Sequence, residues 1–251
     1  MLFNDIIGSG SMLDKDYAEI TEQAIEWIGK KVEAAACAGA VVGMSGGIDS
    51  SVTALLSKRA FPDNMLAVIM PCESNPQDKE DAVLVADKFD IDYEIVDLSD
   101  IYQQLLSKIK EDDHKLAEAN IKPRLRMTTL YYYANLNNYL VVGTDNKSEL
   151  TLGYFTKYGD GGIDLAPLGD LVKSEVREVA KVLEMPKKII TKAPSAGLWE
   201  GQSDEDELGV SYEEIDRYIL TGEGMDKAKE VVEEAKESNG HKLEMPDIFV
   251  V

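Results

Sequence analysis

The stretch V-V-G-M-S-G-G-I-D-S-S-V, residues 41–52, decides the fold. It runs from an apolar strand into a glycine turn and from the turn into a helix. Gly46 and Gly47 let the backbone approach an anion closely and adopt unusual φ values. The helix that follows presents free N–H groups and the positive end of its dipole. The stretch therefore predicts an anion-binding turn at the end of a strand.

This turn differs from the common phosphate-binding loops. A Walker A loop carries a lysine that reaches the terminal phosphates, and residues 41–52 contain no lysine. The dinucleotide pattern G-x-G-x-x-G does not fit either. The turn instead supplies the hydroxyls of Ser45, Ser50 and Ser51, with Asp49 in the first helical turn. We expect Asp49 either to cap the helix or to hold Mg²⁺ beside phosphates, and a kinase-like or GTPase-like mechanism loses support.

Strands and helices alternate on both sides of this turn, which predicts an α/β fold with a single doubly wound parallel sheet and helices on both faces. Ligands of such sheets bind at the carboxyl ends of the strands. Residues 43–51, 71–76 and 143–149 all follow strands, so they should line one crevice. Strands are expected at 40–44, 65–70, 93–96 and 139–143, and helices at 14–38, 49–59, 76–89, 98–110, 123–137 and 173–184.

Beyond residue 185 we expect a loop-rich segment, in which residues 195–210 form either a mobile lid or a solvated loop. The length of 251 residues suits one domain that spans residues 1–251. No apolar run approaches the ~18 residues that a membrane helix needs, and the N-terminus has no signal-peptide pattern. We therefore expect a cytoplasmic protein without a membrane partner.

The formal net charge of −21 argues against nucleic acid as a partner, because nucleic-acid affinity comes mainly from neutralising phosphates. The acidity is concentrated at residues 204–207 and around 230–237, which leaves room for a basic cleft elsewhere. Two cysteines are too few for a disulfide framework or a zinc site.

The composite of strand, S-G-G-x-D-S-S and helix resembles the pyrophosphate loop of the N-type ATP pyrophosphatases, which have the adenine nucleotide alpha hydrolase-like fold. The resemblance implies that ATP is cleaved between its α and β phosphates. A carbonyl or carboxylate oxygen is adenylated, and a nitrogen or sulfur nucleophile then displaces AMP. Because such a loop grips the departing pyrophosphate, the resemblance accounts for the missing lysine.

A second signature, V-V-G-T-D-N-K-S-E-L-T-L-G-Y-F-T-K-Y-G-D-G-G-I-D-L-A-P-L at residues 141–168, closely resembles the ammonia-dependent NAD⁺ synthetases. The resemblance implies a homodimeric ligase of NAD biosynthesis. It would amidate deamido-NAD⁺ with ammonia through an adenylated intermediate, with ATP as co-substrate and Mg²⁺ as cofactor, giving NAD⁺, AMP and pyrophosphate. Further parts of the family pattern stand at residues 123–127, 171–176, 192–198, 204–216 and 241–242.

The resemblance also implies a role for each matching residue. ATP would be bound by Gly43, Met44, Ser45, Gly46, Gly47, Ile48, Asp49, Ser50, Thr144, Lys173 and Ser195. Deamido-NAD⁺ would be bound by Arg124, Lys157, Asp164, His241 and Lys242. Asp49 and Glu149 would ligate Mg²⁺, and Asp49, Lys173 and Asp164 would be the catalytic residues. Ser195 stands where the family usually has threonine, and Pro123 where it has a small residue other than proline.

Several side chains keep two interpretations at this point. Arg126 either pairs with an acid or contacts the substrate, and either Asp160 or Asp164 could accept a hydrogen bond from ammonia. Tyr154 and Phe155 are candidates to stack on the pyridine ring, whereas Tyr131, Tyr132 and Tyr133 are expected in core or interface packing.

Two other functions remain open on the sequence. One is a different ATP pyrophosphatase, such as a tRNA-modifying adenylating enzyme, and the charge of −21 counts against it. The other is a non-catalytic adenine-nucleotide sensor, which would not need Asp49, Glu149 and Lys173. Neither cysteine lies in the nucleophile motif of an amidase, and we expect no amidase domain, so free ammonia is the expected nitrogen donor. The amphipathic helices 14–38 and 123–137 are the expected interface elements.

Overall fold

The computed structural model describes residues 15–109, 114–195, 197, 199, 201–246 and 248–249. Within this part, four strands form one parallel sheet in the order β3-β2-β1-β4. From β1 the chain first adds β2 and β3 on one side and then β4 on the other. The order of the strands therefore changes direction between β1 and β4, and this is the topological switch point of the sheet. The strands are β1 (Gly39–Gly43), β2 (Met65–Ile69), β3 (Tyr93–Ile95) and β4 (Tyr139–Val141).

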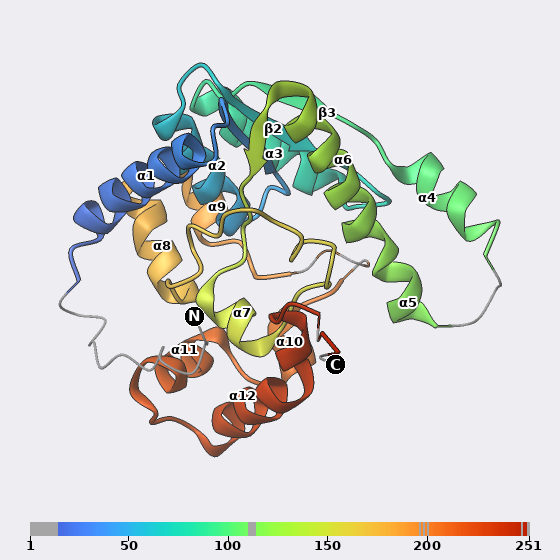
Figure 1. Ribbon diagram of the computed structural model, residues 1–251. Helices are drawn as coiled ribbons and strands as arrows, with labels where there is room; N and C mark the ends of the chain where they lie inside the picture. Colours follow the sequence, from blue (N-terminus) through green and yellow to red (C-terminus); the bar gives the residue numbers. More distant parts are fainter. Residues whose placement is uncertain are drawn as a thin grey trace.

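Helices cover both faces of the sheet (Figure 1). One face carries α1 (Tyr17–Ala34), α2 (Ile48–Ala60), α3 (Pro76–Lys88), α8 (Lys173–Val182) and the short α9 (Lys187–Ile190). The other face carries α4 (Ser99–Leu106) and α6 (Ile121–Asn137), and α5 (Lys115–Ala119) directly precedes α6. Most predicted elements agree with these bounds to within a few residues. Residues 14 and 110, at the ends of two predicted helices, lie outside the described residues.

The side chains of the central strand explain the two layers. Ala40 and Val42 point into the core beneath α1, α2 and α8, whereas Val41 between them packs into the core beneath α6. All three side chains are completely buried. An apolar run that is buried on both faces is typical of a central parallel strand. The predicted doubly wound sheet is therefore confirmed.

The expectation of a loop-rich chain beyond residue 185 was wrong. A third core joins α7 (Lys147–Leu152) to three later helices (Figure 1). Ile215 and Ile219 recur at helical spacing and are buried there, Ser211 caps the start of their helix, and Gly222 ends it with a φ of 71°. The later helices are α10 (Asp204–Leu208), α11 (Tyr212–Thr221) and α12 (Asp226–Asn239), followed by a 3₁₀ turn at Gly240–Lys242.

The segment 195–210, predicted as a lid or a solvated loop, thus contains the helix α10. Residues 196, 198 and 200 lie outside the described residues, and mobility of the segment stays a prediction. As for membranes, the described helices include none with the length and apolar character needed to span a bilayer.

Gly39, at the start of β1, gives a test of the central strand. A Cβ at this position would lie 1.9 Å from the backbone oxygen of Asn64, so we expect Gly39→Ala to destabilise the fold by about 1–3 kcal/mol or more. Gly29 in α1 has open space around it, so Gly29→Ala should stabilise the fold by about 0.5–1 kcal/mol. Urea unfolding measures both, and equal midpoints for the two variants would contradict this packing.

Candidate active site

A cleft of about 1500 Å³ opens at the carboxyl ends of the strands. This volume exceeds the ~300–1,000 Å³ of a typical single-ligand pocket and suits two nucleotide-sized ligands. The cleft is lined by the turn after β1, the end of β2, one side of α6, the segment after β4 and residues of the C-terminal helices. The predicted crevice at residues 43–51, 71–76 and 143–149 therefore coincides with its floor.

The turn after β1 is held by its own serines. The Ser45 backbone N–H donates to Ser50 Oγ at 3.2 Å, and the Ser50 and Ser51 hydroxyls donate to the Gly47 carbonyl at 3.1 and 2.7 Å. Among the described residues, no side chain caps the N-terminus of α2 at Gly47. Asp49 therefore does not cap the helix, and the uncapped N–H groups of the first turn are available to an anion that enters the cleft.

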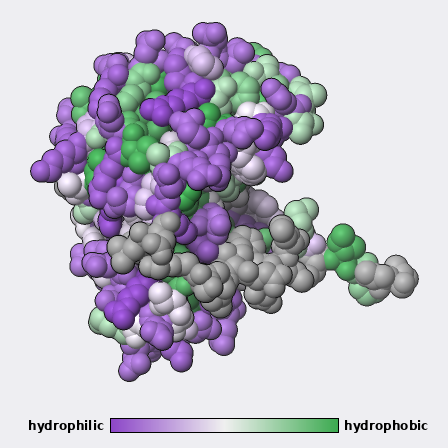
Figure 2. All heavy atoms as spheres, turned by 90° about the vertical axis from the view of Figure 1, so that its left-hand side faces the viewer, coloured by the Kyte–Doolittle hydropathy of each residue, from purple (hydrophilic) through white to green (hydrophobic). Residues whose placement is uncertain are grey.

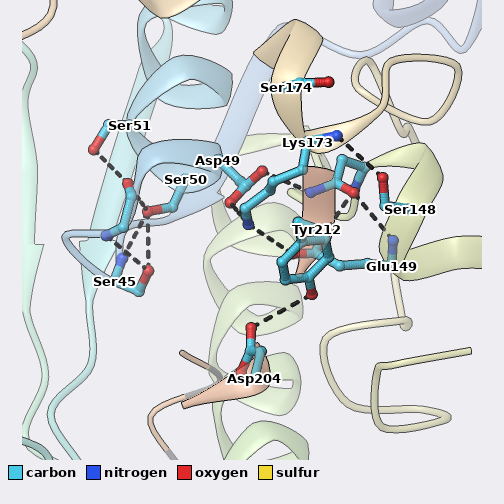
Figure 3. A network of polar contacts seen from close by, with 12 residues as sticks. Ser45, Asp49, Ser50, Ser51, Ser148, Glu149, Lys173, Ser174, Asp204 and Tyr212 are labelled. Atoms are coloured by element: carbon cyan, nitrogen blue, oxygen red, sulfur yellow. Dashed lines mark hydrogen bonds and ion pairs between the residues drawn. The ribbon is translucent and has the colours of Figure 1, made fainter. Parts of the chain in front are cut away.

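Lys173 joins the two acidic residues that were predicted to bind metal (Figure 3). Its Nζ lies 2.6 Å from Asp49 Oδ2 and 2.9 Å from Glu149 Oε1, and the lysine is only 4% exposed. Asn146 Nδ2 donates to the other Asp49 oxygen at 2.8 Å, and the Asn146 backbone N–H donates to Glu149 Oε2 at 3.2 Å. Side chains from α2, α7 and α8 thus form one network on the floor of the cleft.

The network changes the pKa values of its members. Burial, together with the charge of Asp49, raises the pKa of Glu149 to about 7 against the opposing effect of Lys173. Burial alone would lower the pKa of Lys173, but the charges of Asp49 and Glu149 raise it above its ordinary value. Lys173 therefore stays protonated at neutral pH, and the two carboxylates share its charge.

The donors of Asp49 and Glu149 fit a hard divalent cation, since both carboxylates converge on a single cationic group, the Lys173 ammonium. Within the described residues, no group of three or more acidic, histidine or cysteine side chains is arranged to hold a metal by itself. A Mg²⁺ ion held here would thus take its remaining ligands from phosphates and water, as Mg²⁺ commonly does at nucleotide sites.

A buried carboxylate on α11 fixes the starts of α7 and α8. Asp216, 1% exposed, accepts hydrogen bonds from the Ser148 hydroxyl and from the Ser174 backbone N–H. Ser148 Oγ in turn accepts the Lys173 backbone N–H at 3.1 Å. The Tyr212 ring lies 5.3 Å from Lys173 Nζ, and Tyr212 is completely buried. Helix α11 therefore supports both Glu149 and Lys173.

Four of the residues predicted to bind substrate meet at another wall of the cleft, namely Arg124, Lys157, His241 and Lys242. Lys157 donates to the His241 carbonyl, and Arg124 Nη2 donates to the Lys157 carbonyl at 3.3 Å. Lys242 Nζ donates to the Gly153 and Phe155 carbonyls at 2.7 and 3.1 Å. The structure thus gathers basic side chains where anionic ligands would enter.

Asp164 lies apart from this group, outside the described lining of the cleft. Its carboxylate accepts the Tyr131 hydroxyl at 3.0 Å and the Val141 backbone N–H at 2.8 Å. Thr144 and Ser195 both line the cleft, and Ser195 Oγ accepts the Gly197 backbone N–H at 3.1 Å. The substrate-binding and catalytic roles of Asp164 stay predictions.

Two further residues line the cleft: Asp145, to which no role had been given, and Arg126, for which two interpretations were open. Asp145, 4% exposed, has one carboxylate oxygen without a hydrogen-bond partner among the described residues, and burial raises its pKa well above the ordinary value. Arg126 donates to the Met70 carbonyl and to Ser74 Oγ, both at 3.1 Å. No described carboxylate lies within ion-pair distance of Arg126, so the predicted acid partner is absent there. Asp145 stands in the same G-T-D turn as Thr144, which was the available signal.

The fold and the cleft define an α/β nucleotide-binding protein with an open anion-binding turn and a lysine-bridged carboxylate pair at the switch point. The model of the NAD synthase family matches residues 20–246, and the chain belongs to this family. Its fold is accordingly of the adenine nucleotide alpha hydrolase-like type.

Relatives and solved structures agree. The chain is 52% identical over 237 residues to the NH(3)-dependent NAD(+) synthetase of Carboxydothermus hydrogenoformans, covering 93% of this chain and 98% of the relative. It superposes on the NMN synthetase of Francisella tularensis with a TM-score of 0.89 and 36% identity, covering 94% and 99% of the two chains. For the NH3-dependent NAD synthetase of Campylobacter jejuni in complex with the nitrate ion, the TM-score is 0.79 and the identity 34%, with 94% and 100% covered.

The lysine bridge predicts a pH-dependent loss of stability. Lys173→Met leaves two buried carboxylates without their cation, which should cost about 3–5 kcal/mol of unfolding free energy at pH 8. The pKa of Glu149 is raised from its ordinary value of 4.5 to about 7 in the folded protein. Between these two pH values the folded protein binds a proton that the unfolded chain has released, so stability falls as the pH rises from 4.5 to about 7. Without Lys173 this pKa rises further, and the penalty should be smaller at pH 6 than at pH 8.

Lys147→Met is the matched control, because Lys147 pairs at 3.0 Å with Asp170, whose side chain is 86% exposed. A pair of this kind contributes about 0–1 kcal/mol. Urea unfolding at pH 6 and pH 8 compares the two variants. Equal losses for both, or a Lys173→Met loss that does not depend on pH, would contradict the bridge.

Proposed function

We propose that this protein is a ligase that amidates deamido-NAD⁺ with ammonia at the expense of ATP, releasing AMP and pyrophosphate. The observation that carries the proposal is the Asp49–Lys173–Glu149 network beneath an uncapped anion-binding turn, in a cleft with room for two nucleotides. Membership of the NAD synthase family supports the same reaction.

The chemistry requires two steps. A carboxylate resists ammonia because its leaving group would be oxide. In the first step, a carboxylate oxygen of deamido-NAD⁺ attacks the α-phosphorus of ATP, the bond to the β-phosphate oxygen breaks, and pyrophosphate leaves. In the second step, ammonia attacks the acyl carbon, the C–O bond to AMP breaks, and the nitrogen loses a proton as the amide forms. The protein contributes mainly by positioning the reactants and stabilising charge.

The residues of the cleft divide this work. The turn at Gly43–Ser50 would hold the phosphates that become pyrophosphate, with Thr144 and Ser195 also bound to ATP. Lys173 would neutralise charge on the phosphates, while Asp49 and Glu149 would hold Mg²⁺. When bound, Mg²⁺ supplies positive charge that helps the pyrophosphate leave. The basic wall of Arg124, Lys157, His241 and Lys242 would bind deamido-NAD⁺.

Asp160 is the proposed acceptor for the proton and hydrogen bonds of ammonia. Its carboxylate accepts the Thr156 backbone N–H at 2.8 Å and lies in the cleft lining. Burial raises the pKa of Asp160, so Asp160 is a stronger base than an ordinary aspartate in solution.

ATP as a co-substrate suits the expected cytoplasmic location.

One solved structure points to an alternative substrate. The Francisella tularensis structure with a TM-score of 0.89 is an NMN synthetase, which suggests nicotinate mononucleotide as a second acceptor of AMP. The two substrates carry the same reacting carboxylate and differ by an adenylate unit. Measuring kcat/KM for deamido-NAD⁺ and for nicotinate mononucleotide therefore decides between them, and we expect deamido-NAD⁺ to be preferred.

The activity assay supplies ATP, Mg²⁺ and deamido-NAD⁺ with either ammonium or glutamine. We expect NAD⁺ and AMP in equal amounts with ammonium, and no NAD⁺ with glutamine. Asp49→Asn removes a charge that pairs with Lys173 at 2.6 Å, so we expect kcat to fall at least about 100-fold. NAD⁺ formation in the Asp49→Asn variant at the wild-type rate would contradict the assigned role.

The same assay addresses the remaining functions. Pyrophosphate release that depends on tRNA would identify a tRNA-modifying enzyme. ATP binding without any pyrophosphate release would identify a nucleotide sensor.

We further propose that the protein is a homodimer through the face formed by α4 and α6. Exposed apolar side chains gather there, among them Ile101 and Leu105 on α4 and Tyr132 and Leu136 on α6, the last two 63% and 64% exposed. The face on the α1 side is mainly hydrophilic, with apolar residues among the polar ones (Figure 2). A dimer would cover the apolar side chains of α4 and α6, whereas the interface role predicted for residues 14–38 has less support.

Leu136→Glu tests this interface, because a charge on this face would have to be buried in the dimer. We expect the variant to sediment as a monomer at a concentration where the wild type is dimeric. Val182→Glu on α8 is the control, since Val182 is 39% exposed and lies away from α4 and α6. A Leu136→Glu variant that stays dimeric would place the interface elsewhere.

A further inference from the structure

The anion-binding turn contains no lysine, but a lysine distant in the sequence reaches it. Lys192 follows α9, and its Nζ donates to the Gly46 carbonyl at 3.1 Å across a separation of 146 residues. The same Nζ donates to Asp78 Oδ1 and Asp81 Oδ2 on α3, each at 2.8 Å. These three acceptors match the three N–H groups of a lysine ammonium. Lys192 therefore joins α3 and the chain after α9 to the turn.

Gly46 needs to be held in an unusual conformation. Its φ is +79°, which a residue with a side chain rarely adopts. A Cβ on Gly46 would lie 2.2 Å from the Asp78 carbonyl and 3.0 Å from the Ala82 backbone nitrogen. The backbone of α3 thus packs directly against one side of the turn, while Lys192 holds its carbonyl from another.

The charges around Lys192 show that its ammonium is already occupied. Asp81 is 1% exposed and is paired with both Lys188 and Lys192. Burial alone would raise the pKa of Asp81, but its hydrogen bonds with the two lysines lower it, so its carboxylate is ionised. Two aspartates and two lysines balance to zero net charge, which leaves Lys192 little free charge to offer a phosphate.

We propose that Lys192 is a positioning residue for the anion-binding turn: it fixes the Gly46 peptide so that the uncapped N–H groups in the first turn of α2 converge on the pyrophosphate portion of ATP. The proposal rests on the proposed function only in naming ATP as the ligand. Lys192 acts through Gly46 and does not itself contact the phosphates. The turn thereby obtains its rigidity from α3 and the chain after α9, and Ser195 lies three residues further along that same chain.

The test compares Lys192→Met with Lys188→Met. Both variants remove one lysine from Asp81, but Lys188→Met leaves the contact with Gly46 intact. Calorimetry with inorganic pyrophosphate, and separately with ATP in the presence of Mg²⁺, gives the affinities without any turnover. We expect Lys192→Met to weaken both ligands by about 10–100-fold and Lys188→Met by less than about 3-fold, with the KM for ammonia unchanged in both. Equal affinities in wild type and Lys192→Met would overturn the proposal.

The double variant Asp81→Asn, Lys192→Met distinguishes a positioning effect of Lys192 from an effect of its charge. Because the Asp81 carboxylate is removed together with one of its two lysines, the variant also avoids unfolding caused by a buried carboxylate that lacks a cation. If Lys192 acts through Gly46, pyrophosphate affinity stays low in the double variant although the local charge is balanced again. Recovery to the wild-type affinity would overturn the positioning role in favour of a purely electrostatic one. Pyrophosphate binding is measured without turnover. If the wild type formed no NAD⁺, the proposed function would be refuted, but the effect of Lys192→Met on pyrophosphate affinity would still test the positioning role.

Discussion

The site depends on one buried cation shared by two carboxylates. Lys173 connects Asp49, which follows β1, with Glu149, which follows β4, and these are the two strands that flank the switch point of the sheet. Each carboxylate alone would be costly to bury, and the lysine alone equally so. Together they fix α2, α7 and α8 relative to one another, and they form the charged floor on which phosphates and a divalent cation would be bound. Helix α11 supports the arrangement through Asp216.

The sequence predicted the sheet and the floor of the cleft well, because both depend on local patterns. Apolar runs at residues 40–44 and 65–70 are buried on both faces, and the glycine turn after the first run needs no tertiary information to be recognised. Glu149 and Lys173 were assigned through the resemblance of their motifs, and the structure brings them together with Asp49. Their pairing could not be deduced from spacing, since 124 residues separate Asp49 from Lys173.

The sequence analysis failed where tertiary contacts decide the outcome. The helices beyond residue 200 were missed although Ile215 and Ile219 carry helical periodicity, because the chain beyond residue 185 was interpreted as loop-rich. Asp164 was assigned to the substrate from its motif; its carboxylate accepts hydrogen bonds from Tyr131 and the Val141 backbone, which the motif did not indicate, and its assigned role stays a prediction. Lys192 received no role because its contacts with Gly46 and α3 span more than 100 residues.

The central claim is that the cleft activates a carboxylate by adenylation. Deamido-NAD⁺ labelled with ¹⁸O in both oxygens of its nicotinate carboxylate tests this directly when it reacts with ATP and ammonium. The account predicts that one ¹⁸O atom appears in the phosphate of AMP and the other remains in the amide of NAD⁺, detected by mass spectrometry. Label in pyrophosphate, or unlabelled AMP alongside labelled NAD⁺, would contradict attack of the carboxylate on the α-phosphorus.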